Sequence, residues 1–296
     1  MAGAPAVTRS ALARRIDAWE RLTRLDKPIG ILLLLWPTLT ALWIAARGAP
    51  PLSLVIVFAL GTVLMRSAGC AMNDWADRRY DAHVARTRGR PLVAGDLSGG
   101  EALAVGAVLA LAAFGLTLFT NRATMALAVA ALAIAIAYPF FKRFFALPQA
   151  FLGIAFSFGI PMAYAATRGE VEWPGWPMLA INLLWVVAYV TEYAMVDRDD
   201  DLKIGIKTSA ITLGRADVAA IMAFYGLFLA SWALLGRQAG LGAAFLAGIA
   251  LAGAQALWHF TLIRDRSRDG CFRAFRENHW LGATVFAGIV LDYALR

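Results

Sequence analysis

The chain has 296 residues, of which 60% are hydrophobic and only 16% are charged. A mean hydropathy of +0.63 is too high for a water-soluble domain of this length, so a soluble globular fold is excluded. The formal net charge is +8, but the basic residues are spread over several segments with no nucleic-acid-binding module among them. We therefore expect no nucleic-acid partner, and we attribute the positive charge to membrane topology and anionic lipid.

Apolar stretches long enough to cross a bilayer follow one another along most of the chain. A hydrocarbon core about 30 Å thick needs roughly 20 apolar residues in a helix. The stretches are continuous rather than alternating, which indicates helices. The sequence thus predicts an all-α bundle of nine transmembrane helices over residues 29–296, preceded by an arm at residues 1–28. The predicted spans are residues 29–46, 52–72, 101–119, 123–140, 148–166, 176–194, 217–235, 240–261 and 280–294.

The arm has two interpretations. Ile16, Trp19, Leu22 and Leu25 recur at helical spacing between basic residues. This pattern is typical of a helix that lies on the membrane surface, and a helix packed against the bundle would show the same pattern.

The distribution of Lys and Arg predicts the orientation in the membrane. The arm and the connections after the second, fourth, sixth and eighth spans hold 22 of the 28 basic residues. The opposite side holds five, and Arg66 lies inside the second span. Because Lys and Arg accumulate on the cytoplasmic side, we expect a cytoplasmic N-terminus and a C-terminus on the far side.

Two acidic clusters follow the second and sixth spans, both on the predicted cytoplasmic side. Asn73, Asp77 and Asp81 are spaced by four residues, as are Asp197 and Asp201. Residues four apart share one face of a helix, so each face would present oxygen ligands at successive turns. Such ligands suit Mg²⁺, which keeps several waters and takes phosphate oxygens as further ligands. Two opposed faces could hold two ions around a diphosphate.

Basic residues near these clusters are candidates for a phosphate site. Arg66 lies two helical turns before Asn73 on nearly the same face, and a guanidinium in lipid costs ~2.5–3.5 kcal/mol on insertion scales. We therefore expect it to face an internal cavity. The other candidates could equally be topology markers whose charges reach the membrane surface. They are Arg86, Arg88, Arg90, Lys142, Arg143, Lys203 and Lys207.

Three segments together resemble the UbiA family of intramembrane prenyltransferases. They are RLDKPIG to LWPT at 24–38, RSAGC to NDWAD at 66–77, and EYAMVDRDDDLKIGIK at 192–207. The resemblance covers the chain from about Arg21 onward. One departure is Val190 before Thr191, where the family pattern has an aspartate. Any role of that aspartate in related proteins is either absent from this chain or filled by Glu192.

The resemblance implies a fold, a reaction and a site. The fold is nine transmembrane helices around a cavity open to the cytoplasm and laterally to lipid, in the bacterial inner membrane. The reaction is the Mg²⁺-dependent transfer of a polyprenyl group from polyprenyl diphosphate to position 3 of 4-hydroxybenzoate, in ubiquinone biosynthesis. Residues matching the two metal motifs are Asn73, Asp77, Asp81, Asp197 and Asp201.

The groups present support specific roles in that reaction. Asp77, Asp197, Asp201 and Arg143 are the candidate catalytic residues, and either Arg143 or Arg66 would hold the benzoate carboxylate. The substrate-binding candidates also include Lys142, Arg88, Lys203 and Lys207. Tyr138 and Tyr193 are candidate rings for sheltering a prenyl cation, each by a cation–π attraction of ~0.5–2 kcal/mol.

Two alternatives stay open. A prenyltransferase of the same family could act on another aromatic acceptor, such as a naphthoate, a homogentisate or haem. An ion-coupled transporter also uses helical bundles with functional carboxylates, but it would need them near the bilayer midplane rather than at one end.

Overall fold

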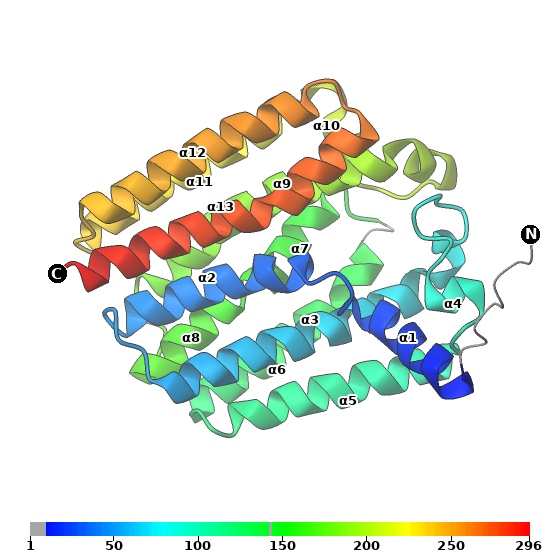
Figure 1. Cartoon of the computed structure of the whole chain (residues 1–296), viewed down its shortest axis with the longest axis horizontal. Coiled ribbons are helices and arrows are strands. Elements are labelled where there is room, and N and C mark those ends of the chain that lie inside the picture. The colour runs from blue at the N-terminus through cyan, green and yellow to red at the C-terminus, as the bar shows by residue number, and fades with distance from the viewer. Residues whose placement is uncertain (1–9, 142–143) are drawn as a thin grey trace, which may run out of the picture.

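The computed structural model describes residues 10–141 and 144–296, and the regular structure in these residues is entirely helical. The long helices lie nearly parallel, with α1 at one end of the bundle and the C-terminus at the other (Figure 1). The helices are α1 Ala11–Thr23, α2 Ile29–Ala45, α3 Leu52–Asp81, α4 Pro91–Ala94, α5 Gly99–Thr117, α6 Arg122–Phe141, α7 Pro148–Ser157, α8 Gly159–Arg168, α9 Gly175–Ile204, α10 Ser209–Leu213, α11 Asp217–Gln238, α12 Ala243–Ile263 and α13 Arg268–Ala294, with a short 3₁₀ turn at Gly214–Ala216.

Seven segments of the described chain are long and apolar enough to cross a membrane: α3, α5, α6, α7 with α8, α9, α10 with α11, and α12. The chain is therefore an integral membrane protein, and the all-α prediction is confirmed. The two remaining predicted spans fall on α2, which has 17 residues, and on the second half of α13. The first half of α13 is rich in charged residues, which hid its helical character from a reading of hydropathy.

The predicted span at 148–166 is interrupted. It consists of α7, which ends at Ser157, and α8, which begins at Gly159. Pro161 explains the break, because its nitrogen cannot donate to the carbonyl of Ser157 and its ring crowds that carbonyl.

Two helices extend well beyond the apolar part of the bundle. Helices α3 and α9 each have 30 residues, which corresponds to about 45 Å at 1.5 Å per residue. A hydrocarbon core is only about 30 Å thick, so their last turns project towards water. Both acidic clusters lie in these last turns, so the helices run beyond the predicted spans and meet the condition on which the four-residue spacing argument depends. We call this end of the molecule the aspartate end.

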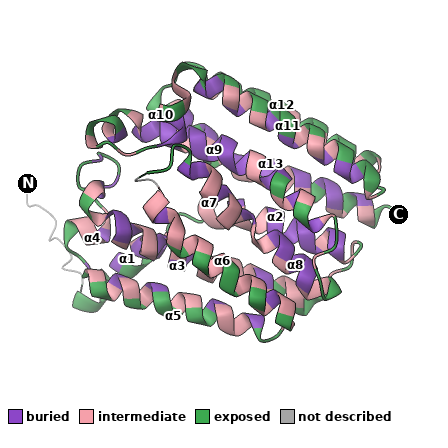
Figure 2. Ribbon diagram, turned by 180° about the vertical axis from the view of Figure 1, so that it is seen from behind, coloured by how far each residue is buried: buried purple, intermediate pink, exposed green. Residues whose placement is uncertain are grey.

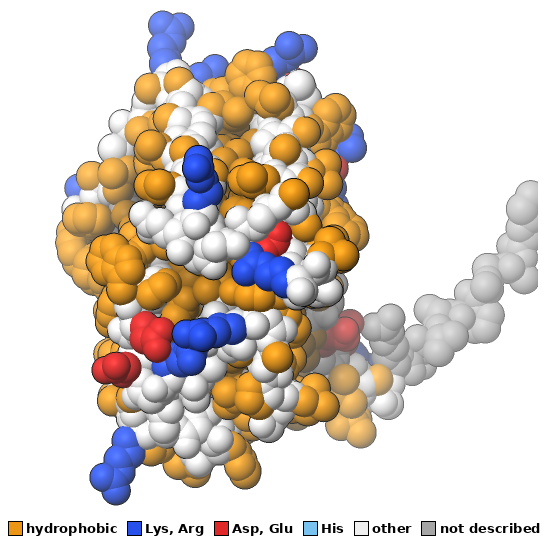
Figure 3. Space-filling model, turned by 90° about the vertical axis from the view of Figure 1, so that its left-hand side faces the viewer, with side chains coloured by type: hydrophobic (Ala, Val, Ile, Leu, Met, Phe, Trp, Pro, Cys, Tyr) orange, Lys and Arg blue, Asp and Glu red, His pale blue; other side chains and the backbone are white. Residues whose placement is uncertain are grey.

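The core is built around α9, which packs against α7, α8, α11 and α13. Its inner positions are fully buried, whereas α5 and α12 at the periphery expose one side (Figure 2). Side chains such as Trp185 and Tyr189 fill the centre. The end opposite the aspartates shows mostly apolar and uncharged surface with a few basic and acidic side chains (Figure 3).

Helix α1 packs against the bundle at the aspartate end. Leu22 is buried in a small cluster with residues of α3 and α5. Arg15 donates to both oxygens of Glu101 at 3.0 and 2.6 Å, and the Trp19 indole donates to Glu101 at 2.9 Å. The opposite face of α1 stays open, with Ile16 52% exposed. The packing interpretation therefore holds for one face, and the other face is available to the membrane surface.

Candidate active site

A single cavity of about 860 Å³ collects the residues of both acidic clusters. Its wall includes Asn73, Asp77 and Asp81 from α3 and Asp197 and Asp201 from α9. The four carboxylate residues are only 7–8% exposed. The four-residue spacing therefore does place oxygen ligands of two helices on one enclosed space. Carboxylates buried to this extent need cations nearby.

The loop after α3 supplies those cations. Arg86 binds Asp197 through Nε at 3.0 Å and Nη2 at 2.5 Å, and so joins the loop of the first cluster to the second cluster. Arg90 donates to Asp81 at 2.6 Å and lies 3.0 Å from Asp74. The sequence predicted that both arginines lie near the acidic clusters, but it did not indicate which aspartate each would bind.

These two guanidinium groups are permanent charges. Burial lowers the pKa of Arg86, but the nearby Tyr193 and Asp197 raise it by more, so the net pKa is raised. Burial likewise lowers the pKa of Arg90, and Asp74 and Asp81 more than compensate. The Arg86 guanidinium also lies 4.5 Å from the centre of the Tyr193 ring. The cavity thus holds fixed positive charge beside its carboxylates.

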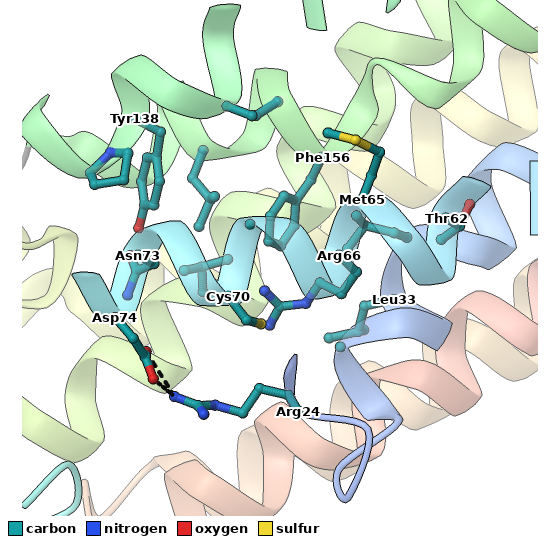
Figure 4. A pocket seen from close by; sticks show the side chains of 18 of the residues that line it. Arg24, Leu33, Thr62, Met65, Arg66, Cys70, Asn73, Asp74, Tyr138 and Phe156 are labelled. Carbon is teal, nitrogen blue, oxygen red and sulfur yellow. Dashed lines mark hydrogen bonds and ion pairs between the residues drawn. The ribbon is translucent and has the colours of Figure 1, made fainter. Parts of the chain in front are cut away.

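Arg24 is a functional candidate that sequence reasoning missed. Its Nη2 lies 2.9 Å from both oxygens of Asp74, which is 1% exposed (Figure 4). From the sequence we would assign Asp74 to solvent or to a layer behind the ligands; the structure buries it between Arg24 and Arg90. The position of Arg24 in the RLDKPIG segment is the feature of the sequence that could have identified it as a candidate.

Arg66 lines the cavity, as predicted from the free-energy cost of placing a guanidinium in lipid. Its guanidinium lies 5.6 Å from the centre of the Phe156 ring, and Figure 4 shows it extended along the cavity. Its Nε is buried and has no hydrogen-bond partner among the described residues, and the same holds for the hydroxyl of Tyr189. Gly30 makes room, because a Cβ there would lie 2.6 Å from the Arg66 Nε. A deep polar subsite with unused donors results.

Aromatic and small apolar side chains form the rest of the wall. Tyr138 and Tyr193 both line the cavity, and Figure 4 shows the Tyr138 hydroxyl directed towards Asn73. Between α3, α5 and α6 the lining becomes apolar, which gives room for a hydrocarbon chain beside the polar end. This part is lined by Phe58, Ala113, Phe114, Ala128, Leu132 and Ala135.

Several predicted substrate-binding residues lie elsewhere. Arg88, Lys203 and Lys207 are exposed and are not part of the cavity wall. Lys203 lies 3.6 Å from Asp200, and Lys207 donates to the carbonyl of Phe144 at 3.2 Å. Lys142 and Arg143 fall outside the described residues. The basic residues on the described wall include Arg24, Lys27, Arg66, Arg86 and Arg90.

Glu192 does not replace the carboxylate missing at position 190. Val190 lines the cavity, whereas Glu192 is fully buried behind the wall. Glu192 accepts hydrogen bonds from Tyr225 at 2.9 Å and from Asn278 at 2.8 Å. This buried network joins α9 to α11 and α13.

The donor set fits Mg²⁺ bound together with a phosphate ligand. Among the described residues, no three Asp, Glu, His or Cys side chains approach closely enough to form a metal site by themselves. Arg86 and Arg90 instead hold Asp197 and Asp81. Hard oxygen ligands that complete the coordination of Mg²⁺ with phosphate oxygens match this arrangement, and arginines can bind the same phosphates bidentately.

Comparisons with known proteins identify the family of this chain. The model of the UbiA prenyltransferase family matches residues 34–282. A protein of Ralstonia nicotianae named 4-hydroxybenzoate octaprenyltransferase is 62% identical over 282 residues, which cover 95% of this chain and 97% of that protein.

Solved structures show the same fold. The apo structure of a UbiA homolog from Aeropyrum pernix K1 superposes with a TM-score of 0.78 at 28% identity, covering 89% of this chain and 97% of that one. A UbiA homolog from Archaeoglobus fulgidus, bound to GPP and Mg²⁺, gives a TM-score of 0.68 at 17% identity, covering 94% and 99%. The chain belongs to the UbiA prenyltransferase family.

Proposed function

We propose that this protein transfers a polyprenyl group from polyprenyl diphosphate to position 3 of 4-hydroxybenzoate, as a step of ubiquinone biosynthesis. The observation that carries the proposal is the cavity itself, in which carboxylates and arginines at one end adjoin an apolar channel. The name of the Ralstonia relative supports the acceptor and suggests an octaprenyl donor. A transporter would need its carboxylates near the middle of the membrane, and here they lie in the last turns of α3 and α9.

Asn73, Asp77, Asp81, Asp197 and Asp201 would hold the magnesium, as two ions on the two opposed helix faces. When bound, Mg²⁺ neutralises the charge that grows on the leaving diphosphate. The Mg²⁺ and GPP bound by the Archaeoglobus homolog support this part of the proposal.

The chain's own residues then stabilise the departure of diphosphate. Arg86 and Arg90 exchange part of their contact with the aspartates for phosphate oxygens, to which they donate charge-assisted hydrogen bonds. These bonds strengthen as the C1–O bond breaks and negative charge moves to diphosphate. Tyr138, Tyr193 and Phe156 shelter the allylic cation and exclude water.

Arg66 and Tyr189 position the acceptor. Their unused donors would bind the benzoate carboxylate, which turns the ring carbon next to the phenol towards C1 of the prenyl group. A carbon–carbon bond forms, and the ring proton leaves to diphosphate or to one of the aspartates. Arg143 remains the alternative carboxylate ligand suggested by the sequence.

We place all nine predicted spans in the bacterial inner membrane, with the arm at 1–28 and the aspartate end in the cytoplasm and the C-terminus in the periplasm. Helices α2 and α13 lie alongside the seven apolar spans, which supports their crossing the membrane. The cavity would open to the cytoplasm for 4-hydroxybenzoate and laterally to lipid for the prenyl chain.

The proposal is tested by product analysis with purified protein, octaprenyl diphosphate, 4-hydroxybenzoate and Mg²⁺. We expect 3-octaprenyl-4-hydroxybenzoate, no product after chelation of Mg²⁺, and at least roughly a hundredfold loss of turnover in Asp77→Asn and Asp197→Asn. Arg88→Gln, outside the cavity, serves as the matched control and should keep its turnover. Near-normal turnover in either aspartate variant would rule out the metal assignment.

A further inference from the structure

A second pocket lies at the end of the bundle opposite the aspartates, and the proposed reaction does not use it. It has a volume of about 580 Å³. Arg47, Arg168 and Arg296 reach it from the ends of α2, α8 and α13. Figure 3 views this end of the molecule, where a few basic and acidic side chains stand close together.

Positive charge is scarce at this end of the molecule. Of the 28 basic residues, five were assigned here from the sequence: Arg47, Arg122, Arg168, Arg237 and Arg296. Three of the five line the one pocket. Membrane topology explains why there are few arginines on this side, but it does not explain why they converge from three separate helices.

The backbone at Arg47 adds a second observation. Only three non-glycine residues of the described chain have a positive φ, and all are arginines: Arg24, Arg47 and Arg266. Two of them place their guanidinium on a buried aspartate: Arg24 on Asp74 and Arg266 on Asp217. Arg47 has φ 51° and no such contact in the described chain, and its side chain lines the pocket. A residue other than glycine in this conformation is strained, which favours a specific use for its side chain.

Tyr293 is packed closely by its neighbours at the pocket wall. Gly48 has φ 92°, and a Cβ there would lie 2.7 Å from Tyr293, so the loop presses closely on that residue. The Arg296 guanidinium lies 5.1 Å from the centre of the Tyr293 ring. Tyr293 lines the same pocket as Arg47, Arg168 and Arg296. The pocket wall therefore combines one tyrosine with three arginines.

The balance of charge defines the ligand. Arg296 is paired with Asp292, and Arg168 lies 3.7 Å from Glu172. Arg47 has no acidic partner among the described residues, so the site suits an anionic ligand. Phosphate oxygens accept from guanidinium and hydroxyl donors together. We propose that this pocket binds a phosphate group, supplied by the headgroup of an anionic phospholipid in the adjoining leaflet or by free phosphate.

The test uses the full chain in neutral detergent, with phosphatidylglycerol, phosphatidylcholine or inorganic phosphate added. The shift of the thermal unfolding midpoint and the amount of lipid retained in native mass spectrometry are measured. Phosphatidylglycerol should stabilise the wild-type protein and phosphatidylcholine should not. Combining Arg47→Gln with Arg168→Gln should weaken binding at least tenfold. Equal stabilisation by inorganic phosphate identifies free phosphate as a ligand, whereas an effect of phosphatidylglycerol alone identifies a lipid headgroup.

The matched control is Arg237→Gln, which removes one exposed arginine of the same end outside the pocket. It should bind phosphatidylglycerol like the wild type. The double variant should keep its ligand-free midpoint and its prenyl transfer, which shows that it is folded. Binding unchanged in the double variant, binding lost equally in Arg237→Gln, or no binding of either phosphate probe would overturn the proposal.

Discussion

At the scale of single residues, Arg66 is the side chain that folding alone explains least. A guanidinium deep in a membrane bundle carries a large desolvation cost, and native structures usually offset it with a carboxylate. The Arg66 guanidinium lies over the ring of Phe156, and its Nε has no hydrogen-bond partner among the described residues. Such a group contributes to function by meeting a charged ligand, which supports its assignment to the acceptor carboxylate.

Arg66→Gln removes that charge and therefore tests the assignment. Hydrogen bonds to charged groups contribute roughly 1.5–3 kcal/mol, so the KM for 4-hydroxybenzoate should rise by about 10- to 150-fold. The KM for the prenyl diphosphate should change much less. Steady-state kinetics with each substrate varied in turn separates the two, and an equal rise in both KM values contradicts the role.

Gly30→Ala tests the same subsite without changing any charge. The new Cβ would lie 2.6–2.7 Å from the Arg66 guanidinium, whose flexible side chain must move. We expect an unchanged unfolding midpoint but a severalfold higher KM for 4-hydroxybenzoate. Gly226→Ala is the control, because nothing lies within 4 Å of its added Cβ. If both variants behave alike, the position of Arg66 does not control acceptor binding.

At the scale of elements, the sequence predicted what depends on local spacing and missed what depends on distant contacts. The four-residue repeats in 73–81 and 197–201 share one helix face only if the helices continue through the acidic clusters, and α3 and α9 do so. The pairing of Arg86 with Asp197 joins residues 111 positions apart, and no periodicity encodes it. The break between α7 and α8 was visible as Pro161, but mean hydropathy across the segment concealed it.

Helix α1 couples the N-terminal arm to the cavity, because Arg24 follows it directly and binds Asp74. Leu22 anchors α1 and is fully buried. Leu22→Ala should cost about 2–5 kcal/mol of local packing free energy and release the helix. Limited proteolysis should then cut within residues 11–28 faster and prenyl transfer should fall. Leu12→Ala, at a site 67% exposed, is the control; equal proteolysis of the two variants would show that α1 is not held through Leu22.

At the scale of the whole molecule, the structure separates two ends with different charges. The aspartate end carries the cavity and α1, and the C-terminus lies at the other end (Figure 1). The distribution of basic residues in the sequence predicts two sides with different charge. The length of α13 and the packing of α2 against α8 and α13 could not be derived from it, since they depend on which helix faces meet.

The orientation is checked by cysteine labelling in intact spheroplasts. The two native cysteines, Cys70 and Cys271, are buried and should react little. A membrane-impermeant maleimide should label Ala49→Cys, in the exposed loop between α2 and α3, but not Ser10→Cys at the start of α1. Permeabilised cells should label both. Labelling of Ser10→Cys alone in intact spheroplasts would reverse the proposed topology.

The central claim is that the cavity prenylates 4-hydroxybenzoate, and acceptor competition tests it most directly. Purified protein receives Mg²⁺, octaprenyl diphosphate and equal concentrations of 4-hydroxybenzoate, a dihydroxynaphthoate and homogentisate, and the products are separated by mass spectrometry. We predict that 3-octaprenyl-4-hydroxybenzoate dominates in the wild type and that Arg66→Gln loses this preference. Preferential prenylation of the naphthoate or of homogentisate by the wild-type protein would contradict the account.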